Sequence, residues 1–530
     1  MKKLYVFDST LRDGAQGKNV NFSVIDKINI VKALDSFGVH YIEAGNPFSN
    51  PKDVEFFEKI KDVPLKNAKI VAFGSTRHAG VDINEDKSVQ LMTNVSVDTV
   101  AIFGKSWDLH VDEILRTSRE ENIAMITDTI ACLKNNGKTV FFYAEHFFDG
   151  CKNNEEYAFE VIKSAEKAGA EFVILCDTNG GSFPDEIAEF TKKAKETLSC
   201  GIGIHCHNDT GCAVANTISA VKSGATQIHG TFVGIGERCG NTCLSTVIPN
   251  LQLKLGYDIV PEENMKNLTE CAKCISEISN LTIQDNLPYI GKSAFSHKGG
   301  MHIDGVVKLN KSFEHISPES VGNHRQFLIS EMSGKTAVLS KINKFAPDIT
   351  KDSPELVDII EMLKMQEQKG YQYEAAEASF ELLVRKFLGR FTPYFEIIYF
   401  KIICEQDSSV DTPASGLVKI RVGNEYKISA GEGNGPVNAL DSALRKALVE
   451  FYPDLEKFFL IDYKVRVVDT TSATAAAVRV LIESTDKNSV WTTVGSSTDI
   501  LNASVKALVD SVEYKLFKMG VKPIVKEKYD

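Results

Sequence analysis

The sequence lacks the features of a protein that binds nucleic acid or lies on an anionic membrane. Its 60 lysines and arginines are outnumbered by 71 acidic residues, which gives a net charge of -11 at pH 7. No general excess of positive charge is available for phosphate groups. Residues 1–8 hold two lysines and four apolar residues before an aspartate, too few for a secretory signal. We therefore expect a cytoplasmic protein whose partners are small molecules, with no nucleic acid or membrane among them.

A disulfide framework is also not indicated. The eleven cysteines are an odd number spread through a long chain without secretory context, which is typical of reduced thiols. Cys271 and Cys274 form a lone CxxC inside a helical pattern. Because no second pair completes a tetrahedral zinc site, we favour a structural role for these two cysteines.

Two kinds of periodicity alternate in the first half of the chain. A length of 530 residues exceeds what one hydrophobic core usually fills, so we expect a large domain and further domains after it. Segments with helical periodicity separate eight short β-rich runs: Leu4–Phe7, Tyr41–Glu43, Ile70–Phe73, Thr99–Phe103, Val140–Tyr143, Phe172–Cys176, Ile202–His205 and Gln227–Thr231. Eight such units within about 250 residues predict an α/β fold, the (β/α)8 or TIM barrel.

Polar residues follow the predicted strands, where a barrel of this kind places its active site. The most informative stretch is the seventh strand and its end. His205 and His207 alternate with Ile204 and Cys206, so a strand would send both imidazoles to one side and the apolar residues to the other. On their own, two such histidines could equally be hydrogen-bonded strand residues.

Other strand ends supply further ligand types. Asp13 follows the first strand, Glu145 ends the fifth, and Asn241 follows the eighth. A carboxylate, two imidazoles and an amide oxygen suit a catalytic Mg²⁺, Mn²⁺ or Zn²⁺ that leaves room for water and substrate. The barrel therefore predicts a divalent-metal site at this rim.

Four motifs carry a family resemblance: Asp8–Gln16, His205–Asp209, Gly234–Asn241 and His297–His302. With them, the sequence resembles the acyl-CoA-dependent 2-oxoacid aldol synthases, which include 2-isopropylmalate, homocitrate and citramalate synthases. The resemblance covers essentially the whole chain. It implies a metallolyase-type barrel, acetyl-CoA as co-substrate, and one set of metal ligands: Asp13, His205, His207 and Asn241.

The resemblance also implies roles for other side chains. Arg12 would bind the oxoacid and stabilise the alkoxide as it forms, although it could instead make a structural ion pair with Glu43 or Glu145. Thr178 would bind the oxoacid carboxylate, its alternative role being that of a turn residue. Glu145 would order the site around the acetyl methyl group and a water. His302 would be the base for enolate formation, or part of a relay to it.

Two positions depart from the family pattern. Phe313 stands eleven residues after His302, where relatives usually carry a tyrosine, so a catalytic tyrosine there is in doubt. Cys239 replaces a small residue in the glycine-rich segment. Together with Cys206, Cys212 and Cys243 it is interpreted here as one of four buried small residues.

The substrate is predicted from the wall of the pocket. Tyr143, Phe73 and Phe103 near strand ends make that wall bulky and apolar, which favours pyruvate and hence (R)-citramalate as product. The reaction would be the first step of a pyruvate route to 2-oxobutyrate and isoleucine. A homocitrate-type oxoacid needs another cation, for which His110 is the nearest candidate. Synthesis of 2-isopropylmalate from 2-oxoisovalerate is the closest alternative, followed by a carbon–carbon lyase and an inactive metabolite sensor.

The second half of the chain predicts two more domains after a barrel at residues 1–280. Residues 281–390 would form a linker subdomain that covers the active site, and residues 391–530 a regulatory domain. Strand and helix patterns repeat there, from residues 416–444 to 465–508, which indicates a duplicated α+β unit. By the resemblance, this region would form a homodimer and bind isoleucine as an effector; the sequence does not identify the effector-binding residues.

Overall fold

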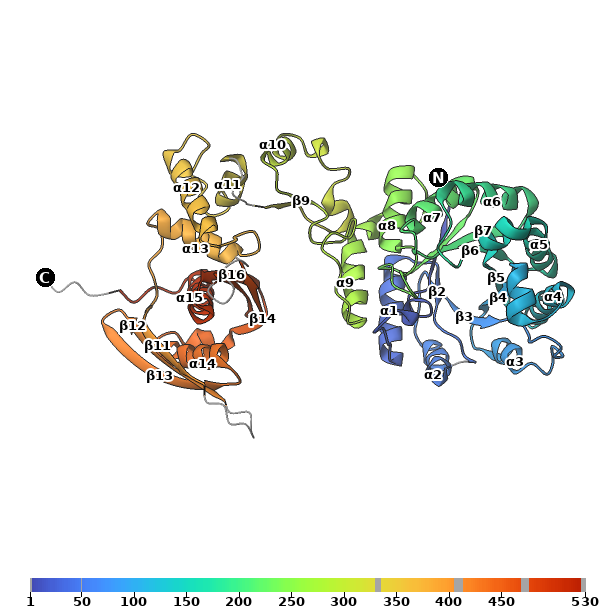
Figure 1. Cartoon of the computed structure of the whole chain (residues 1–530), viewed down its shortest axis with the longest axis horizontal. Coiled ribbons are helices and arrows are strands. Elements are labelled where there is room, and N and C mark those ends of the chain that lie inside the picture. The colour runs from blue at the N-terminus through green and yellow to red at the C-terminus, as the bar shows by residue number, and fades with distance from the viewer. Residues whose placement is uncertain (1, 49, 329–334, 405–412, 469–475, 526–530) are drawn as a thin grey trace. The chain divides into compact units, whose positions relative to one another are not determined.

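The computed structural model describes residues 2–48, 50–328, 335–404, 413–468 and 476–525 (Figure 1). The chain divides into two compact units. The first contains residues 1–295 and 315–325, and the second contains residues 296–314 and 326–530. The predicted domain boundaries at 280 and 390 stay predictions.

The first unit is built around a closed barrel of parallel strands, which confirms the predicted TIM barrel. The strands pair in chain order, and β1 pairs with β8 to close the ring. The barrel comprises β1 (Tyr5–Asp8), β2 (Tyr41–Glu43), β3 (Lys69–Ser75), β4 (Thr99–Lys105), β5 (Thr139–Glu145), β6 (Phe172–Asp177), β7 (Gly201–Cys206) and β8 (Gln227–Gly230).

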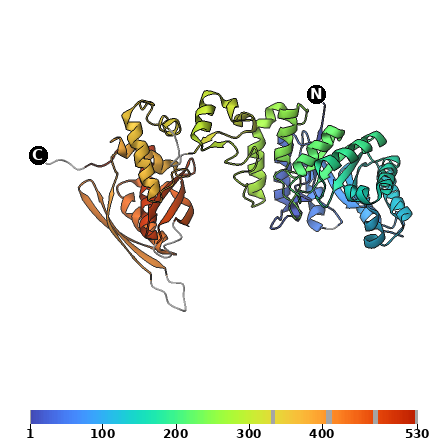
Figure 2. The ribbon, with the colours of Figure 1, turned by 45° about the horizontal axis from the view of Figure 1, so that its top comes forward.

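Helices surround this barrel, as the blue and green part of the ribbon shows (Figure 2). They are α1 (Val24–Phe37), α2 (Pro51–Ile60), α3 (Lys87–Asn94), α4 (Arg119–Asn135), α5 (Phe147–Ala168), α6 (Pro184–Thr197), α7 (Ala213–Ser223), α8 (Leu244–Pro249) and α9 (Leu268–Ile278). Local signals fix their starts. In α1, for example, Ser23 accepts a hydrogen bond from the Asp26 amide while the Asp26 side chain accepts one from the Ser23 amide.

Alternation along the strands produces two separate cores. The outward side chains, such as Val6, Ile42 and Ile204, pack against the helices. The inward side chains fill the barrel with Phe7, Tyr41, Val71, Ala101, Phe141, Tyr143, Phe172, Ile174 and Cys176. This inner core fills the interior of the barrel, so substrates bind at its ends.

Gly203 in β7 provides space inside this core. A Cβ atom at this position would lie 2.9 Å from Ile174 Cγ1 and 3.1 Å from His229 Nε2. The absence of a side chain therefore allows His229 of β8 to lie next to β7.

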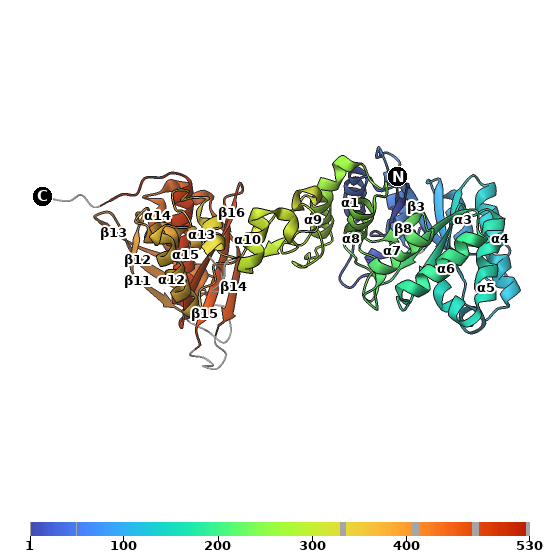
Figure 3. The ribbon, with the colours of Figure 1, turned by 90° about the horizontal axis from the view of Figure 1, so that it is seen from above.

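Among the described residues, the second unit contains six α-helices, a two-stranded pair and two three-stranded sheets. The first four helices are α10 (Gly300–Lys308), α11 (Lys335–Ile342), α12 (Pro354–Gln368) and α13 (Glu377–Phe387), and a short parallel pair joins β9 (Ser296–His297) to β10 (Gln326–Phe327). Each three-stranded sheet is an antiparallel meander followed by a helix (Figure 3). The two passes are β11 (Glu396–Ile403), β12 (Ala414–Val422), β13 (Glu425–Gly433) and α14 (Pro436–Val449), then β14 (Phe459–Val467), β15 (Val478–Thr485), β16 (Val490–Ser497) and α15 (Ile500–Lys518).

This repetition confirms the predicted duplication of an α+β unit. Alternate residues of β12, including Val418, Ile420 and Val422, are buried with Leu444 of α14 and Leu508 of α15 in one core. In the part of the chain that the structure describes, no helix combines the length and the hydrophobicity needed to cross a membrane.

Candidate active site

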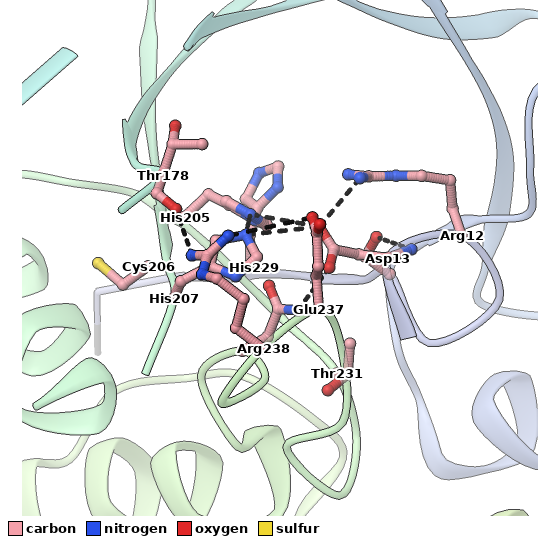
Figure 4. Close-up of polar contacts among 12 residues, drawn as sticks. Arg12, Asp13, Thr178, His205, Cys206, His207, His229, Thr231, Glu237 and Arg238 are labelled. Atoms are coloured by element: carbon pink, nitrogen blue, oxygen red, sulfur yellow. Dashed lines mark hydrogen bonds and ion pairs between the residues drawn. The ribbon is translucent and has the colours of Figure 1, made fainter. Parts of the chain in front are cut away.

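Three predicted metal ligands meet at the rim of the barrel (Figure 4). The Nε2 atoms of His205 and His207 lie 3.4 Å apart, and Oδ2 of Asp13 lies 3.6 Å from the first and 3.7 Å from the second. The point equidistant from three atoms so spaced is about 2 Å from each, the usual length of a bond from a divalent ion to nitrogen or oxygen. The separations therefore fit a shared ion.

The protonation states of these groups also fit. Burial lowers the pKa of His205 to about 3 and lowers the pKa of His207, so both imidazoles are neutral at pH 7. Burial acts against ionisation of Asp13, but Arg12, the two histidines and the hydrogen bond from Asn241 together outweigh it, and the pKa of this carboxyl lies below its usual value. Neutral imidazoles and an ionised carboxylate are the forms that bind metals.

The fourth predicted ligand, Asn241, is held in place by the glycine-rich segment. His207 and Asn241 form an isolated backbone bridge, and the Asn241 side-chain amide donates to Oδ1 of Asp13 at 2.8 Å. Its Oδ1 atom is buried and has no hydrogen-bond partner among the described residues. A carbonyl oxygen of this kind is a suitable ligand for a hard divalent ion.

The tight path of this segment explains its glycines. Gly236 has φ +152°, and a Cβ atom there would lie 2.2 Å from the Asn241 side-chain nitrogen and 3.1 Å from Oδ1 of Asp13. A glycine at this position lets the chain pass directly over the two side chains.

Arg12 lies beside the metal-ligand cluster and is bound by two carboxylates. Its Nε donates to Glu43 at 2.7 Å and its Nη1 donates to Asp13 at 2.9 Å, while its guanidinium lies 4.1 Å from the centre of the Phe73 ring. The ion pair with Glu43, weighed as an alternative from the sequence, is therefore present. The guanidinium also borders a cavity of about 300 Å³. Arg12 is thus fixed in orientation while it faces open space.

Glu145, at the end of β5, makes an ion pair with Lys105 of β4. The paired register of the two strands, Lys105 opposite Glu145, explains the contact.

Thr178 accepts a hydrogen bond from the His146 amide through Oγ1 at 2.9 Å, and its carbonyl accepts from Arg238 at 2.7 Å. Its position in a turn after β6 agrees with the structural alternative, and its hydroxyl proton stays available to a ligand.

His110 begins a short π-helical segment, His110–Leu115, that follows β4. Its ring stacks on Trp107 at 5.0 Å and lies 4.2 Å from the His146 ring. Burial and the neighbouring His146 lower the pKa of His110. A neutral ring stacked among aromatic groups does not supply the extra cation that a dicarboxylic oxoacid needs.

The three aromatic residues of the predicted apolar wall contact one another, and their role in a substrate pocket stays a prediction. The Phe73 and Phe103 rings stack at 5.5 Å, and Tyr143 meets Phe73 edge-on at 5.7 Å. Tyr143 is 3% exposed, and its hydroxyl lies 3.0 Å from Glu43 Oε1 and 3.0 Å from His229 Nδ1. The tyrosine therefore fills space and also takes part in a polar network inside the barrel.

His302 belongs to the second unit, in α10, and is not part of the barrel rim. Its ring stacks on Phe313 at 4.2 Å, so the phenyl group that replaces the expected tyrosine contacts the proposed base directly. The role of His302 stays a prediction.

The interpretation of four buried thiols holds in full only at Cys206. Cys212 and Cys243 are half-buried, and Cys239 is exposed. All eleven cysteines are free thiols, as expected.

Family comparisons agree with this architecture. The family model described as HMGL-like matches residues 3–275, which contain the whole barrel. The chain belongs to the HMGL-like family. In this member, a model described as homocitrate synthase post-HMGL domain-like matches residues 289–370, and one described as LeuA allosteric (dimerisation) domain matches residues 374–516.

Relatives of this HMGL-like protein match along nearly its full length. The (R)-citramalate synthase of Aquifex aeolicus (strain VF5) is 50% identical over 519 residues, which are 98% of each chain. The (R)-citramalate synthase of Geobacter sulfurreducens is 46% identical over the same length and coverage. The 2-isopropylmalate synthase of Methanocaldococcus jannaschii is 30% identical over 518 residues, which are 97% of this chain and 95% of that one.

Proposed function

We propose that this chain is an acyltransferase that condenses acetyl-CoA with pyruvate and water to give (R)-citramalate and CoA. The observation that carries the proposal is the combination of the Asp13, His205 and His207 cluster with near-full-length identity of 42–50% to five (R)-citramalate synthases. The identity to a 2-isopropylmalate synthase is lower, at 30%.

The shape of the site supports a small oxoacid. The contacting rings of Tyr143, Phe73 and Phe103 would leave little space for a branched side chain. The methyl group of pyruvate is the smallest substituent a 2-oxoacid of this class carries. A hydrophobic pocket discriminates one methylene by only about 1–3 kcal/mol, so slow turnover of 2-oxobutyrate is expected as well.

The proposed metal ligands are Asp13, His205, His207 and Asn241. A Mg²⁺, Mn²⁺ or Zn²⁺ ion bound by them would polarise the ketone of the oxoacid. Arg12, which Glu43 and Asp13 hold at 2.7 and 2.9 Å, places a fixed positive charge where the ketone oxygen gains negative charge. A charge positioned before the reaction needs no reorganisation in the transition state.

The remaining roles concern protons and the acyl group. We propose His302 as the base that removes a proton from the acetyl methyl group; the resulting enolate carbon then forms the new bond to the ketone carbon of pyruvate. Glu145, held by Lys105, would orient the water that later hydrolyses the thioester and releases CoA. Thr178 would donate a hydrogen bond from its hydroxyl group to the pyruvate carboxylate.

The second unit supports a homodimer under control by isoleucine. Tyr463, Val465 and Val467 of β14 are 38–46% exposed and form an apolar strip on one face of the sheet, opposite Ile482, Val480 and Val478 of β15. Apolar strips of this extent on a sheet are typical of protein interfaces. The match to a LeuA allosteric (dimerisation) domain is the second support for both parts of this proposal.

The test is CoA release from acetyl-CoA by the purified, metal-supplemented protein with pyruvate, 2-oxobutyrate, 2-oxoisovalerate or 2-oxoglutarate. We expect pyruvate to have the highest kcat/KM and isoleucine, not leucine, to inhibit. A preference for 2-oxoisovalerate would favour 2-isopropylmalate synthesis instead. Absence of release with every oxoacid would contradict the proposal altogether.

A further inference from the structure

A chain of four buried polar side chains runs beneath the active site across three strands of the barrel. Gln227 and His229 lie on β8, Tyr143 on β5 and Glu43 on β2, and none is more than 3% exposed. Gln227 Oε1 lies 2.8 Å from His229 Nε2, His229 Nδ1 lies 3.0 Å from the Tyr143 hydroxyl, and that hydroxyl lies 3.0 Å from Glu43 Oε1. We call this set the Glu43 chain.

The number of protons in the Glu43 chain restricts how it is arranged. If His229 donated from Nε2 to Gln227 Oε1, its Nδ1 would be an acceptor. The single hydroxyl proton of Tyr143 would then face two acceptors, His229 Nδ1 and Glu43 Oε1, at the same distance. One buried contact would lack a proton, which is unfavourable.

The opposite arrangement gives every contact one proton. With the Gln227 amide turned by half a rotation, its nitrogen donates to His229 Nε2, His229 Nδ1 donates to Tyr143, and Tyr143 donates to Glu43. In the unturned orientation, the Gln227 nitrogen is buried without a hydrogen-bond partner among the described residues, which supports the turn. The His229 ring is fully buried, which disfavours a doubly protonated, charged form.

We propose that His229, as a neutral ring with its proton on Nδ1, is a positioning residue for Arg12. It directs the Tyr143 proton to Glu43 Oε1, while the other oxygen of that carboxylate accepts from Ser9, at 2.5 Å, and from Arg12, at 2.7 Å. Phe7 stacks on the His229 ring at 4.1 Å and prevents it from rotating. The inference rests on the proposed function, in which Arg12 acts on the developing alkoxide.

The kinetic test uses three variants of the full chain. His229→Leu removes the donor, His229→Asn keeps an N–H near the position of Nδ1, and Tyr143→Phe removes the link to Glu43 while keeping the ring. We expect His229→Leu to lower kcat about tenfold or more, with the KM for pyruvate changed by less than about threefold, because Arg12 acts mainly in the transition state. His229→Asn should restore most of kcat.

Combination with Tyr143→Phe separates positioning from packing. If His229 acts through Tyr143, then His229→Leu has no further effect on kcat once the hydroxyl is absent. An equal loss in both backgrounds, or a wild-type kcat in His229→Leu, would overturn the inference.

A second measurement does not depend on turnover. In ¹⁵N-histidine-labelled protein, the resonances absent from His229→Asn identify His229, and their nitrogen shifts report which nitrogen carries the proton. We expect Nδ1 alone to be protonated; a proton on Nε2 alone, or on both nitrogens, would contradict the proposal. If the wild-type protein released no CoA, the proposed function would fail while this result would still decide the state of the Glu43 chain.

Discussion

Two neutral imidazoles beside an ionised carboxylate define the active site at the scale of single residues. The low pKa values of His205 and His207 follow from burial, and the low pKa of Asp13 follows from the combined effect of Arg12, the two histidines and Asn241, which exceeds that of burial. No proton has to leave the histidines near pH 7 before an ion binds. The metal affinity of this site should therefore be high and nearly independent of pH in that range.

Loss of one ligand tests this site. We expect His205→Ala to lower kcat with pyruvate by about a thousandfold or more and to reduce the metal retained after dialysis, because an open position loses both charge stabilisation and substrate orientation. Atomic emission spectroscopy measures the metal content. His78→Ala, a change at a side chain that is 64% exposed and outside the site, is the matched control. Full metal content in His205→Ala would contradict the ligand assignment.

A buried carboxyl at the end of β1 makes stability depend on pH. Burial raises the pKa of Asp8 to about 7, while hydrogen bonds from the Thr10 amide and hydroxyl, both 2.9 Å, act in the opposite direction. The unfolded chain ionises this group from about pH 4, but the folded chain keeps its proton to about pH 7. Asp8 therefore lowers the free energy of unfolding progressively as the pH rises from about 4 to about 7.

Asp8→Asn removes this cost, because the amide can accept from the Thr10 N–H and donate to its hydroxyl. Each pKa unit corresponds to about 1.4 kcal/mol, so we expect the variant to be more stable than wild type by roughly 2–4 kcal/mol at pH 8 and nearly equal at pH 4. Thermal unfolding of both proteins across this range measures the difference. A difference of the same size at every pH would mean that ionisation of Asp8 is not its cause.

Among the loops that join the strands and helices, the loop after β8 shows a clear requirement for glycine. Gly236 and Gly211 both have positive φ, at +152° and +75°, so an alanine strains the backbone at either position. Only at Gly236 does the new Cβ atom meet a site residue, 2.2 Å from the Asn241 side chain. The two glycines therefore differ mainly in their effect on the site.

We expect Gly236→Ala to lower kcat at least about tenfold by displacing Asn241, and Gly211→Ala to change kcat by less than about threefold. Both should lower the melting temperature slightly, by the shared backbone strain. CoA release and thermal unfolding on the same preparations provide the comparison. Equal activity in the two variants would show that the loop tolerates a side chain over Asn241.

Elements with strong periodicity could be predicted, and contacts between distant elements could not. The eight strands follow from short β-rich apolar runs, and the rim residues follow because parallel strands end together. The ion pair of Lys105 with Glu145 requires the register of β4 and β5, and the contact of Tyr143 with His229 joins residues 86 positions apart. Such pairs depend on packing inside the closed barrel, which no local pattern encodes.

The structure of the whole molecule is that of two compact units, each with its own core. The barrel carries the metal-ligand cluster, whereas the proposed base His302 and the duplicated sheets belong to the second unit. A reaction that needs groups from both units would be sensitive to how the chain is assembled. The oligomeric state of the chain therefore bears on the proposed reaction.

The apolar strip on β14 predicts how the chain assembles. We expect light scattering to give about twice the 58.5 kDa mass of one chain, and Val465→Lys to shift it toward the single-chain mass, because a charge buried in an apolar interface is unfavourable. Lys487→Glu, in the turn after β15, is the control that should stay dimeric. A dimer that is unaffected by Val465→Lys would place the interface elsewhere.

In the proposed reaction, the barrel joins the acetyl methyl carbon to the ketone carbon of pyruvate. The most direct measurement is ¹³C NMR of the product formed from acetyl-CoA and [2-¹³C]pyruvate by the metal-supplemented full chain. We expect the labelled ketone signal to be replaced by that of a quaternary carbon bearing a hydroxyl group, in step with CoA release. CoA release without loss of the labelled ketone signal, or a labelled ketone that persists with no CoA release, would contradict this reaction.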